Sequence, residues 1–330
     1  MKFGPLPVAE AKGAILAHAL RLPSGVLKKG RTLTSADLRE IAEAHIAEII
    51  VAQLGPTDVE ENTAAARLAA AISPHPQAAH LRLADAFTGR VNLYARTAGV
   101  TVLDVDAIHA LNRVNPLITL ATSHPYTRVS AGALVGTVKI ISYAVPEADL
   151  TAACAAAAHA VRIQPATIAD ATLILTDLPG ALDSAKGEAS VARRLDALGV
   201  GLAETLHVPH AANAVGEAIE RAKGGLILVL TASATSDPAD VAPAGLVHAG
   251  GTLTHFGMPV DPGNLLFLGD YESTPVIGLP GCARSPALNG ADWVMERVLC
   301  GIPVTSDDIA RMGVGGLLKE IKTRPQPREG

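Results

Sequence analysis

The segment from Gly224 to Gly290 most constrains the fold, because two of its apolar runs stop abruptly at small polar, glycine and proline residues. The run GLILVLT over 225–231 precedes ASATSDPAD, and the run TPVIGLP over 274–280 precedes GCARSP. Apolar runs of this length are typical of strands that are covered on both faces. Ligands of α/β domains bind just beyond the carboxyl ends of such strands. The segment therefore predicts an α/β domain with a binding site for a small phosphorylated molecule.

The rest of the chain predicts a division into three parts. Residues 161–304 alternate strands at 171–176, 225–231 and 274–280 with helices at 191–198, at 211–223 and from 286, which predicts a parallel, doubly wound sheet. Residues 1–160 predict an α+β region with helices over 36–47 and 59–72 and strands at 49–54, 90–94, 100–103, 117–121 and 134–145. Residues 305–330 end in the polar, proline-rich KTRPQPREG and predict a tail or linker.

Composition excludes several classes of protein. The 27 lysines and arginines are outnumbered by 32 acidic residues and form no basic run, which argues against nucleic-acid binding. The 3 cysteines are far apart, which argues against a disulfide framework or a structural zinc site and fits a reducing compartment. No apolar run reaches about 18 residues, and the N-terminus is a poor signal peptide. We therefore expect a cytoplasmic protein without a membrane span.

The loop after the first apolar run is rich in groups that bind phosphate. Its hydroxyl side chains, together with backbone N–H groups, can cradle a phosphate at a strand end; they are Thr231, Ser233, Thr235 and Ser236. Asp237 and Asp240 follow, and they can hold a Mg²⁺ ion or orient a water as catalytic residues. The alternative is structural, in which Ser236 or Asp237 caps a helix that begins at Pro238.

Two further loops are candidates for ligand contact. In FGMPVDPGN (256–264), prolines and glycines predict a rigid, open loop that presents backbone donors or merely connects strands; its candidate residues are Met258, Pro259, Asp261, Gly263 and Asn264. In LPGCARS (279–285), a helix capped by Ser285 and starting at Pro286 would favour an anion at its N-terminus. Arg284 adds a positive charge, Gly281 permits close approach of the backbone, and Pro280 and Cys282 complete the loop.

Other catalytic signatures are missing from the sequence. His207, His210, His248 and His255 form no H-x-x-x-H pair, so we interpret them as surface or capping residues rather than metal ligands. Neither G-x-S-x-G nor G-x-G-x-x-G occurs.

The order of these motifs resembles the molybdopterin-binding domain of molybdenum cofactor biosynthesis proteins, which is shared with gephyrin. That family has a strand, then S-G-G-x-S with an Asp soon after, then M-x-P-G-x-P-L-x-F-G, and then P-V-x-G-L-P-G. The corresponding segments here are TASATSD at 231–237, MPVDPGNLLFLG at 258–269 and PVIGLPG at 275–281. The N-terminal half is similar less specifically, at 11–18, 25–30 and 58–61.

The resemblance implies a three-layer, mostly parallel α/β domain after an α+β region, and molybdopterin or the molybdenum cofactor as ligand. Ser236 matches the family's binding Ser/Thr, Asp237 stands near its Asp, and Gly281 with loop 258–264 matches its pterin and phosphate surfaces. The loops are most similar to a bacterial branch that matures xanthine-oxidase-type molybdoenzymes and is often followed by a cytidylyltransferase-like domain. Relatives form dimers or trimers, so the resemblance also implies a homo-oligomer.

Two departures from the family pattern separate three possible functions. Ser233-Ala234 replaces the family's Gly-Gly, and TDLPG follows strand 171–176 where the family has T-G-D-E. A cofactor carrier would bind the ligand and pass it to a nucleotidyltransferase or an apo-molybdoenzyme. An enzyme would insert molybdate into adenylylated molybdopterin, with Mg²⁺ at Asp237 or Asp240. A scaffold would keep only a vestigial pocket. The lost glycines favour the carrier over the enzyme, and the retained loops argue against the scaffold.

Overall fold

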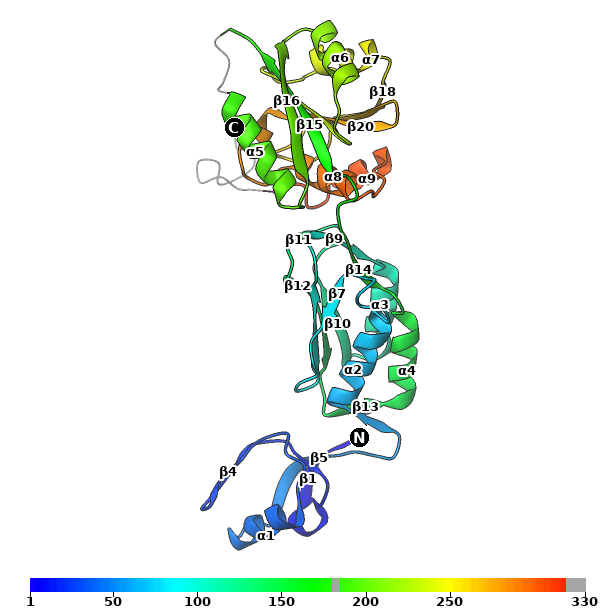
Figure 1. The fold of residues 1–330 in the computed structure, drawn as a ribbon. Coiled ribbons are helices and arrows are strands. Elements are labelled where there is room, and N and C mark those ends of the chain that lie inside the picture. Colours follow the sequence, from blue (N-terminus) through cyan, green and yellow to red (C-terminus); the bar gives the residue numbers. More distant parts are fainter. Residues whose placement is uncertain (180–183, 319–330) are drawn as a thin grey trace, which may run out of the picture. The chain divides into compact units, whose positions relative to one another are not determined.

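The computed structural model describes residues 1–179 and 184–318 and shows a mixed α/β protein with several sheets (Figure 1). The chain forms two compact units. Unit 1 contains Met1–Thr97, Thr101–Pro125 and Ala131–Ile163. Unit 2 contains Ala98–Val100, Tyr126–Ser130 and the chain from Gln164 onward. Within the described ranges, no helix is long and apolar enough to cross a membrane.

Unit 1 begins with a small antiparallel sheet of order β1 (Lys2–Pro7), β5 (Glu48–Gln53) and β2 (Ile15–Leu16). The 3₁₀ turn η1 (Val8–Glu10) follows β1, and β3 (Leu20–Leu22) and β4 (Gly25–Leu27) form a hairpin. Helix α1 (Ser35–Glu43) starts where predicted, because Thr34 and Asp37 form a reciprocal capping box.

The remainder of unit 1 is an antiparallel sheet with helices. The sheet order is β10 (Ile118–Thr122), β12 (Leu134–Ile140), β8 (Arg90–Ala95) and β7 (Leu81–Leu83). The helices are α2 (Glu61–Ile72), α3 (Val105–Val114) and α4 (Glu147–Ala156), the last two of which were not predicted. A short pair joins β13 (Ala144–Pro146) to β6 (Asp58–Glu60), and β9 (Gly99–Leu103) pairs with β14 (Val161–Gln164). Strand β11 (Arg128–Val129) belongs to unit 2.

Three predicted boundaries in unit 1 are wrong. The helix expected over 36–47 ends already at Glu43, with Ala44 as its C-cap and His45 in a left-handed conformation. The helix expected over 59–72 begins only at Glu61, because Asp58–Glu60 pairs as β6 and the Glu60 carboxylate caps the helix. The single strand expected over 134–145 is two strands, β12 and β13, which belong to different sheets.

Unit 2 is built on a six-stranded sheet. Its order is β16 (Gly201–Pro209), β15 (Asp170–Asp177), β17 (Ile227–Leu230), β20 (Thr274–Leu279), β19 (Phe267–Tyr271) and β18 (Thr252–Phe256). The first four strands are parallel, whereas β19 runs antiparallel to both of its neighbours. The strands predicted at 171–176, 225–231 and 274–280 are confirmed as β15, β17 and β20.

Both faces of this sheet are buried, as the continuous apolar runs predict. Leu175 and Leu228 point into one core cluster, which they share with α5 (Ser184–Asp196) and α8 (Gly290–Leu299). Ile174 and Val229, which are the chain neighbours of Leu175 and Leu228, point into a second cluster with α6 (Ala212–Arg221) and α7 (Val241–His248). Helices α5 and α8 thus contribute to one cluster, and α6 and α7 contribute to the other.

Part of the segment expected to be a tail is folded. Helix α9 (Ser306–Arg311) begins at a capping box between Thr305 and Asp308, and the buried Ile309 and Met312 join the first core cluster of unit 2. The predicted tail therefore starts too early, because these apolar residues are part of the core. Residues 319–330 lie outside the described residues.

Candidate functional site

Three loops leave the six-stranded sheet at one edge. β17 and β20 are parallel, and β18 runs in the same direction as β20 because both are antiparallel to β19. The loops after β17 (231–240), after β20 (280–289) and between β18 and β19 (257–266) therefore all start at the carboxyl edge of the parallel strands. All the predicted site residues lie in these loops, at the edge where α/β sheets bind ligands.

The hydroxyls after β17 are not all directed toward a ligand. Thr231 Oγ1 donates to the Ser233 carbonyl at 2.6 Å and lies 3.2 Å from Thr235 Oγ1, and both threonines are buried. Ser233 and Ser236 are exposed. Two of the four hydroxyls thus stabilise the loop from within, which leaves the two serines for contact with a ligand.

The two aspartates of this loop bond to backbone N–H groups. Asp240 caps α7: its Oδ1 accepts from Val241 N at 2.7 Å and its Oδ2 accepts from Ser236 N at 3.0 Å. Asp237 Oδ1 accepts from Ala239 N at 2.8 Å. The alternative prediction was a helix that begins at Pro238 with Ser236 or Asp237 as its cap. The helix begins instead at Val241, because Asp240 is the N-cap. Over residues 1–179 and 184–318, no three His, Cys, Asp or Glu side chains gather as metal ligands.

The loop 257–266 is anchored rather than open. Met258 and Val260 are buried in the core of unit 2, so they do not form a ligand surface. Asp261 N donates to the Gly316 carbonyl at 2.8 Å, and the Asp261 carbonyl accepts from Leu318 N at 3.0 Å. Pro259 and Asn264 remain exposed.

The same loop also touches the start of α8. The Pro262 carbonyl accepts from Gly290 N at 2.8 Å. A Cβ on Gly263 would lie 2.6 Å from Gly290 N, so only glycine permits this approach.

The helix expected at Pro286 starts later. A 3₁₀ turn, η2 (Gly281–Arg284), follows β20, and α8 begins at Gly290. Asn289 is its N-cap, in a capping box with Asp292. Because the Asn289 and Asp292 side chains and the Pro262 carbonyl already accept from the first N–H groups, this helix start is not a site for an external anion.

The residues in and beside η2 differ in how far they are exposed to solvent. Gly281 is exposed, and a Cβ there would meet nothing within 4 Å, so the backbone is open to a ligand. Pro280 is buried and Ser285 is exposed. Cys282 is half-buried, and burial raises the pKa of its thiol. A reactive thiolate is therefore disfavoured at this position.

A residue that the sequence analysis missed holds the η2 loop in place. The buried Arg194 of α5 forms an ion pair with Asp292 of α8 and donates to the carbonyls of Ala283, Ser285 and Ala287. Its role could not be read from the sequence, because the partners lie about ninety residues further along the chain. This network makes η2 a rigid support.

Arg284 places a positively charged side chain at the carboxyl edge of the sheet. Its Nη2 donates to the Thr231 carbonyl at 2.8 Å, which joins η2 to the loop after β17. Its Nη1 is buried and has no hydrogen-bond partner within the described part of the chain. Burial lowers the pKa of this guanidinium, and the Asp177 carboxylate offsets part of that effect. A half-buried guanidinium with an unused donor has the chemistry to bind an anion.

Four further residues at this edge were not predicted. Thr176 Oγ1 accepts from Ala232 N at 2.8 Å and lies 2.9 Å from His210 Nδ1. His207 Nδ1 lies 3.4 Å from Asp177 Oδ2. Because strand β16 was not predicted, His207 was interpreted as a surface or capping residue, whereas it lies in that strand. His210 follows the strand and lies just before α6. The alternation of Leu202, Leu206 and Val208 with more polar neighbours was the available signal.

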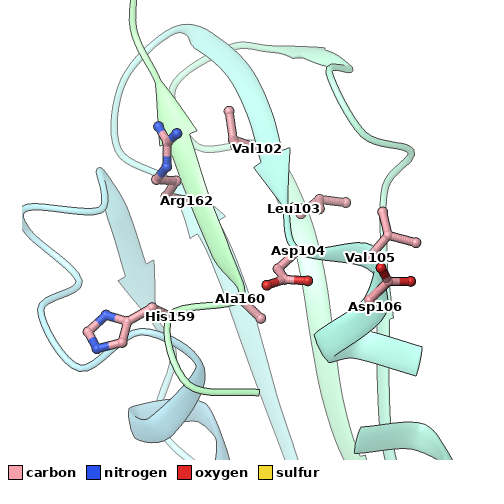
Figure 2. A pocket seen from close by; sticks show the side chains of 8 residues that line it. All are labelled: Val102, Leu103, Asp104, Val105, Asp106, His159, Ala160 and Arg162. Atoms are coloured by element: carbon pink, nitrogen blue, oxygen red, sulfur yellow. The ribbon is translucent and has the colours of Figure 1, made fainter. Parts of the chain in front are cut away.

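A pocket of about 450 Å³ lies in unit 1, away from every predicted site residue. Figure 2 shows Asp104, Asp106, His159 and Arg162 around it. Asp104 is the N-cap of α3, and its carboxylate already accepts a hydrogen bond from Ala107 N at 3.0 Å. We therefore assign no ligand to this pocket and place the candidate site at the carboxyl edge of unit 2.

Comparisons with known proteins give distant matches. A family model described as a domain of unknown function, DUF8806, matches residues 5–53. No curated protein matches the chain. One similar solved structure is the molybdopterin biosynthesis moea protein from Pyrococcus horikosii, with 14% identity, a TM-score of 0.29, and coverage of 95% of this chain and 77% of that chain.

A second similar structure is a molybdenum cofactor biosynthesis protein from Pyrococcus furiosus. It has 13% identity and a TM-score of 0.25, over 92% of this chain and 66% of that chain. Neither match is similar enough to carry a conclusion about the function of this chain.

Proposed function

We propose that this chain binds molybdopterin, or the molybdenum cofactor made from it, at the carboxyl edge of the sheet in unit 2 and passes it on during cofactor biosynthesis. The observation that carries the proposal is Arg284, a half-buried guanidinium whose Nη1 lacks a partner among the described residues, at the edge where the motif loops converge. The motifs at 258–269 and 275–281 support the choice of ligand, and the burial of both sheet faces supports a three-layer molybdopterin-binding domain over 161–304.

The residues at this edge fit a phosphorylated pterin. Arg284 supplies a donor and a positive charge for the phosphate, and the open backbone at Gly281 lets the ligand approach closely. The exposed hydroxyls of Ser233 and Ser236 supply further donors. Because Arg194 fixes the carbonyls of η2, the ligand does not have to order this loop on binding.

Binding and transfer are favoured over catalysis of molybdate insertion. Insertion would need Mg²⁺, yet both carboxylate oxygens of Asp240 accept backbone N–H groups, which leaves Asp237 as the freer carboxylate. The recipient that we propose is a cytidylyltransferase domain or an apo-molybdoenzyme. We further propose that the chain acts as a homo-oligomer in a bacterial cytoplasm. A scaffold with a vestigial pocket is the outcome if no ligand binds.

The proposal is tested by the pterin content of the purified chain. The full chain is isolated from a molybdopterin-producing host, and bound pterin is oxidised to its fluorescent products and quantified. We expect a stoichiometric signal in wild type, its loss in Arg284→Gln, and its retention in Arg193→Gln. Arg193 is the matched control because it is exposed and, among the described residues, donates to the Ala189 carbonyl of its own helix.

Two results would change the proposal. A folded wild-type chain without pterin, even after incubation with molybdopterin, contradicts it. Mg²⁺-dependent release of AMP from adenylylated molybdopterin, abolished by Asp237→Ala, would establish the inserting enzyme instead.

A further inference from the structure

We infer that His207 and His210 couple anion binding at this edge to proton uptake, so that a dianionic phosphate group binds together with a proton on the histidines. The inference rests on the proposed site, because the anion it concerns is the one beside Arg284. It goes beyond that proposal, because it assigns a role to two residues outside every motif that identifies the ligand.

The parallel pair of β15 and β16 brings the two histidines to the carboxyl edge. In the register of this pair, Leu175 lies beside His207 and Asp177 lies beside Pro209. His207 therefore lies two residues before the end of the pairing, and its Nδ1 is 3.4 Å from Asp177 Oδ2. Both side chains are about half exposed, at 46% and 56%, so protons exchange with solvent freely.

His210 is joined to the Arg284 side of the site through a single peptide group. Thr231 and Ala232 share that group: its carbonyl accepts from Arg284 Nη2, and its N–H donates to Thr176 Oγ1. Thr176 Oγ1 in turn contacts His210 Nδ1 at 2.9 Å. A neutral imidazole accepts the threonine proton, and an imidazolium donates to the same oxygen. The contact therefore persists in both protonation states.

The acidic residues near the site oppose anion binding, and a proton on the histidines offsets their charge. The Asp177 carboxylate acts on Arg284 and would repel an anion bound there. Glu188 of α5 is a second acid near this side of β16, because its carboxylate accepts from the hydroxyl of Thr205, two residues before His207. Among the described residues, these contacts place two acids, Asp177 and Glu188, and the guanidinium of Arg284 on this side of the site. Protonation of His207 neutralises Asp177, and a proton on His210 adds positive charge at the same edge.

The test uses sulfate, which remains a dianion between pH 6 and pH 8, so that every proton taken up belongs to the protein. Sulfate binding to the full chain is measured by calorimetry at pH 6, pH 7 and pH 8, in two buffers of different ionisation enthalpy. We expect wild type to bind sulfate several-fold more tightly at pH 6 and to take up a proton at pH 7. The double variant His207→Gln/His210→Gln should bind with an affinity that does not depend on pH.

A control variant and the imidazole signals make the result specific. His248→Gln, at the exposed end of α7, should keep the wild-type pH dependence. In wild type, addition of sulfate at pH 7 should change the proton NMR chemical shifts of the His207 and His210 rings.

The failure of this inference differs from the failure of the proposed function. Equal sulfate affinity at both pH values, or an unchanged pH dependence in the double variant, overturns the coupling even if the chain carries pterin. Sulfate that does not bind at either pH also overturns it. Proton-coupled sulfate binding in a chain that never carries pterin sustains the coupling and removes only the proposed ligand.

Discussion

Glu296 gives the prediction whose size follows most directly from the structure. This carboxyl lies on α8 with its side chain 6% exposed, and Arg128 donates to it at 2.9 Å. Burial nevertheless raises its pKa from 4.5 to about 8, with Asp292 adding to the rise and Arg128 and Arg194 opposing it. The folded chain therefore holds a proton here that the unfolded chain releases once the pH exceeds 4.5.

The sign and magnitude of the effect follow from linkage. The contribution of protonated Glu296 to the free energy of unfolding is fully present below pH 4.5 and is lost as the pH rises to about 8. Within this window the loss is about 1.4 kcal/mol per pH unit, or up to about 5 kcal/mol over the window. Glu296→Gln keeps an acceptor for Arg128 without a titrating proton, so it should remove this part of the pH dependence.

The assay is urea unfolding between pH 5.5 and pH 8.5, followed by the fluorescence of Trp293, which is the single tryptophan of the chain and lies on the same helix. We expect the unfolding free energy of wild type to fall more steeply with pH than that of Glu296→Gln, so that the variant is relatively more stable at pH 8.5. Parallel slopes for the two proteins would refute the reasoning and mean that the ion pair with Arg128 outweighs burial.

Four further substitutions test the residues that support the site. Arg194→Met should cost about 3–5 kcal/mol in chemical unfolding, because it leaves Asp292 buried without its partner, and a loss below 1 kcal/mol would show that the network is dispensable. Asp240→Ala should lower the free energy of unfolding by about 1 kcal/mol and Asp237→Ala by much less, because Asp240 is the residue that caps α7. A larger loss for Asp237→Ala in thermal denaturation would contradict this assignment of the cap. Gly187→Ala should weaken pterin retention, because its Cβ would lie 3.0 Å from Nη1 of Arg284, and unchanged pterin content would exclude that group from the site.

The parts of the fold that the sequence predicts correctly are those governed by local rules. Strands β15 and β17 are continuous apolar runs, which are stable only when both faces of the sheet are buried. Helix α1 begins at a capping box whose two residues, Thr34 and Asp37, are only three positions apart in the sequence. β16 was missed because it lies at the edge of the sheet, where its side chains are mostly part-exposed and its apolar pattern is weak.

The errors in the candidate site come from contacts between distant segments. Pro286 has the chemistry of a first helical residue, but α8 starts at Gly290, where the Pro262 carbonyl and the side chains of Asn289 and Asp292 meet its N-terminus. The loop at 258–264 has the composition of an open ligand loop, yet the backbone of residues 316–318 is bound to it. Such pairings are fixed by tertiary packing, which spacing and composition do not encode.

The most direct test of the proposed function is the amount of fluorescent pterin per chain after purification from a molybdopterin-producing host. We expect close to one pterin per wild-type chain and almost none on Arg284→Gln, with the same far-ultraviolet circular dichroism for both proteins. Equal pterin on the two proteins would contradict the assignment of the site to the carboxyl edge at Arg284. No pterin on a folded wild-type chain supplied with molybdopterin would contradict the assignment of the ligand.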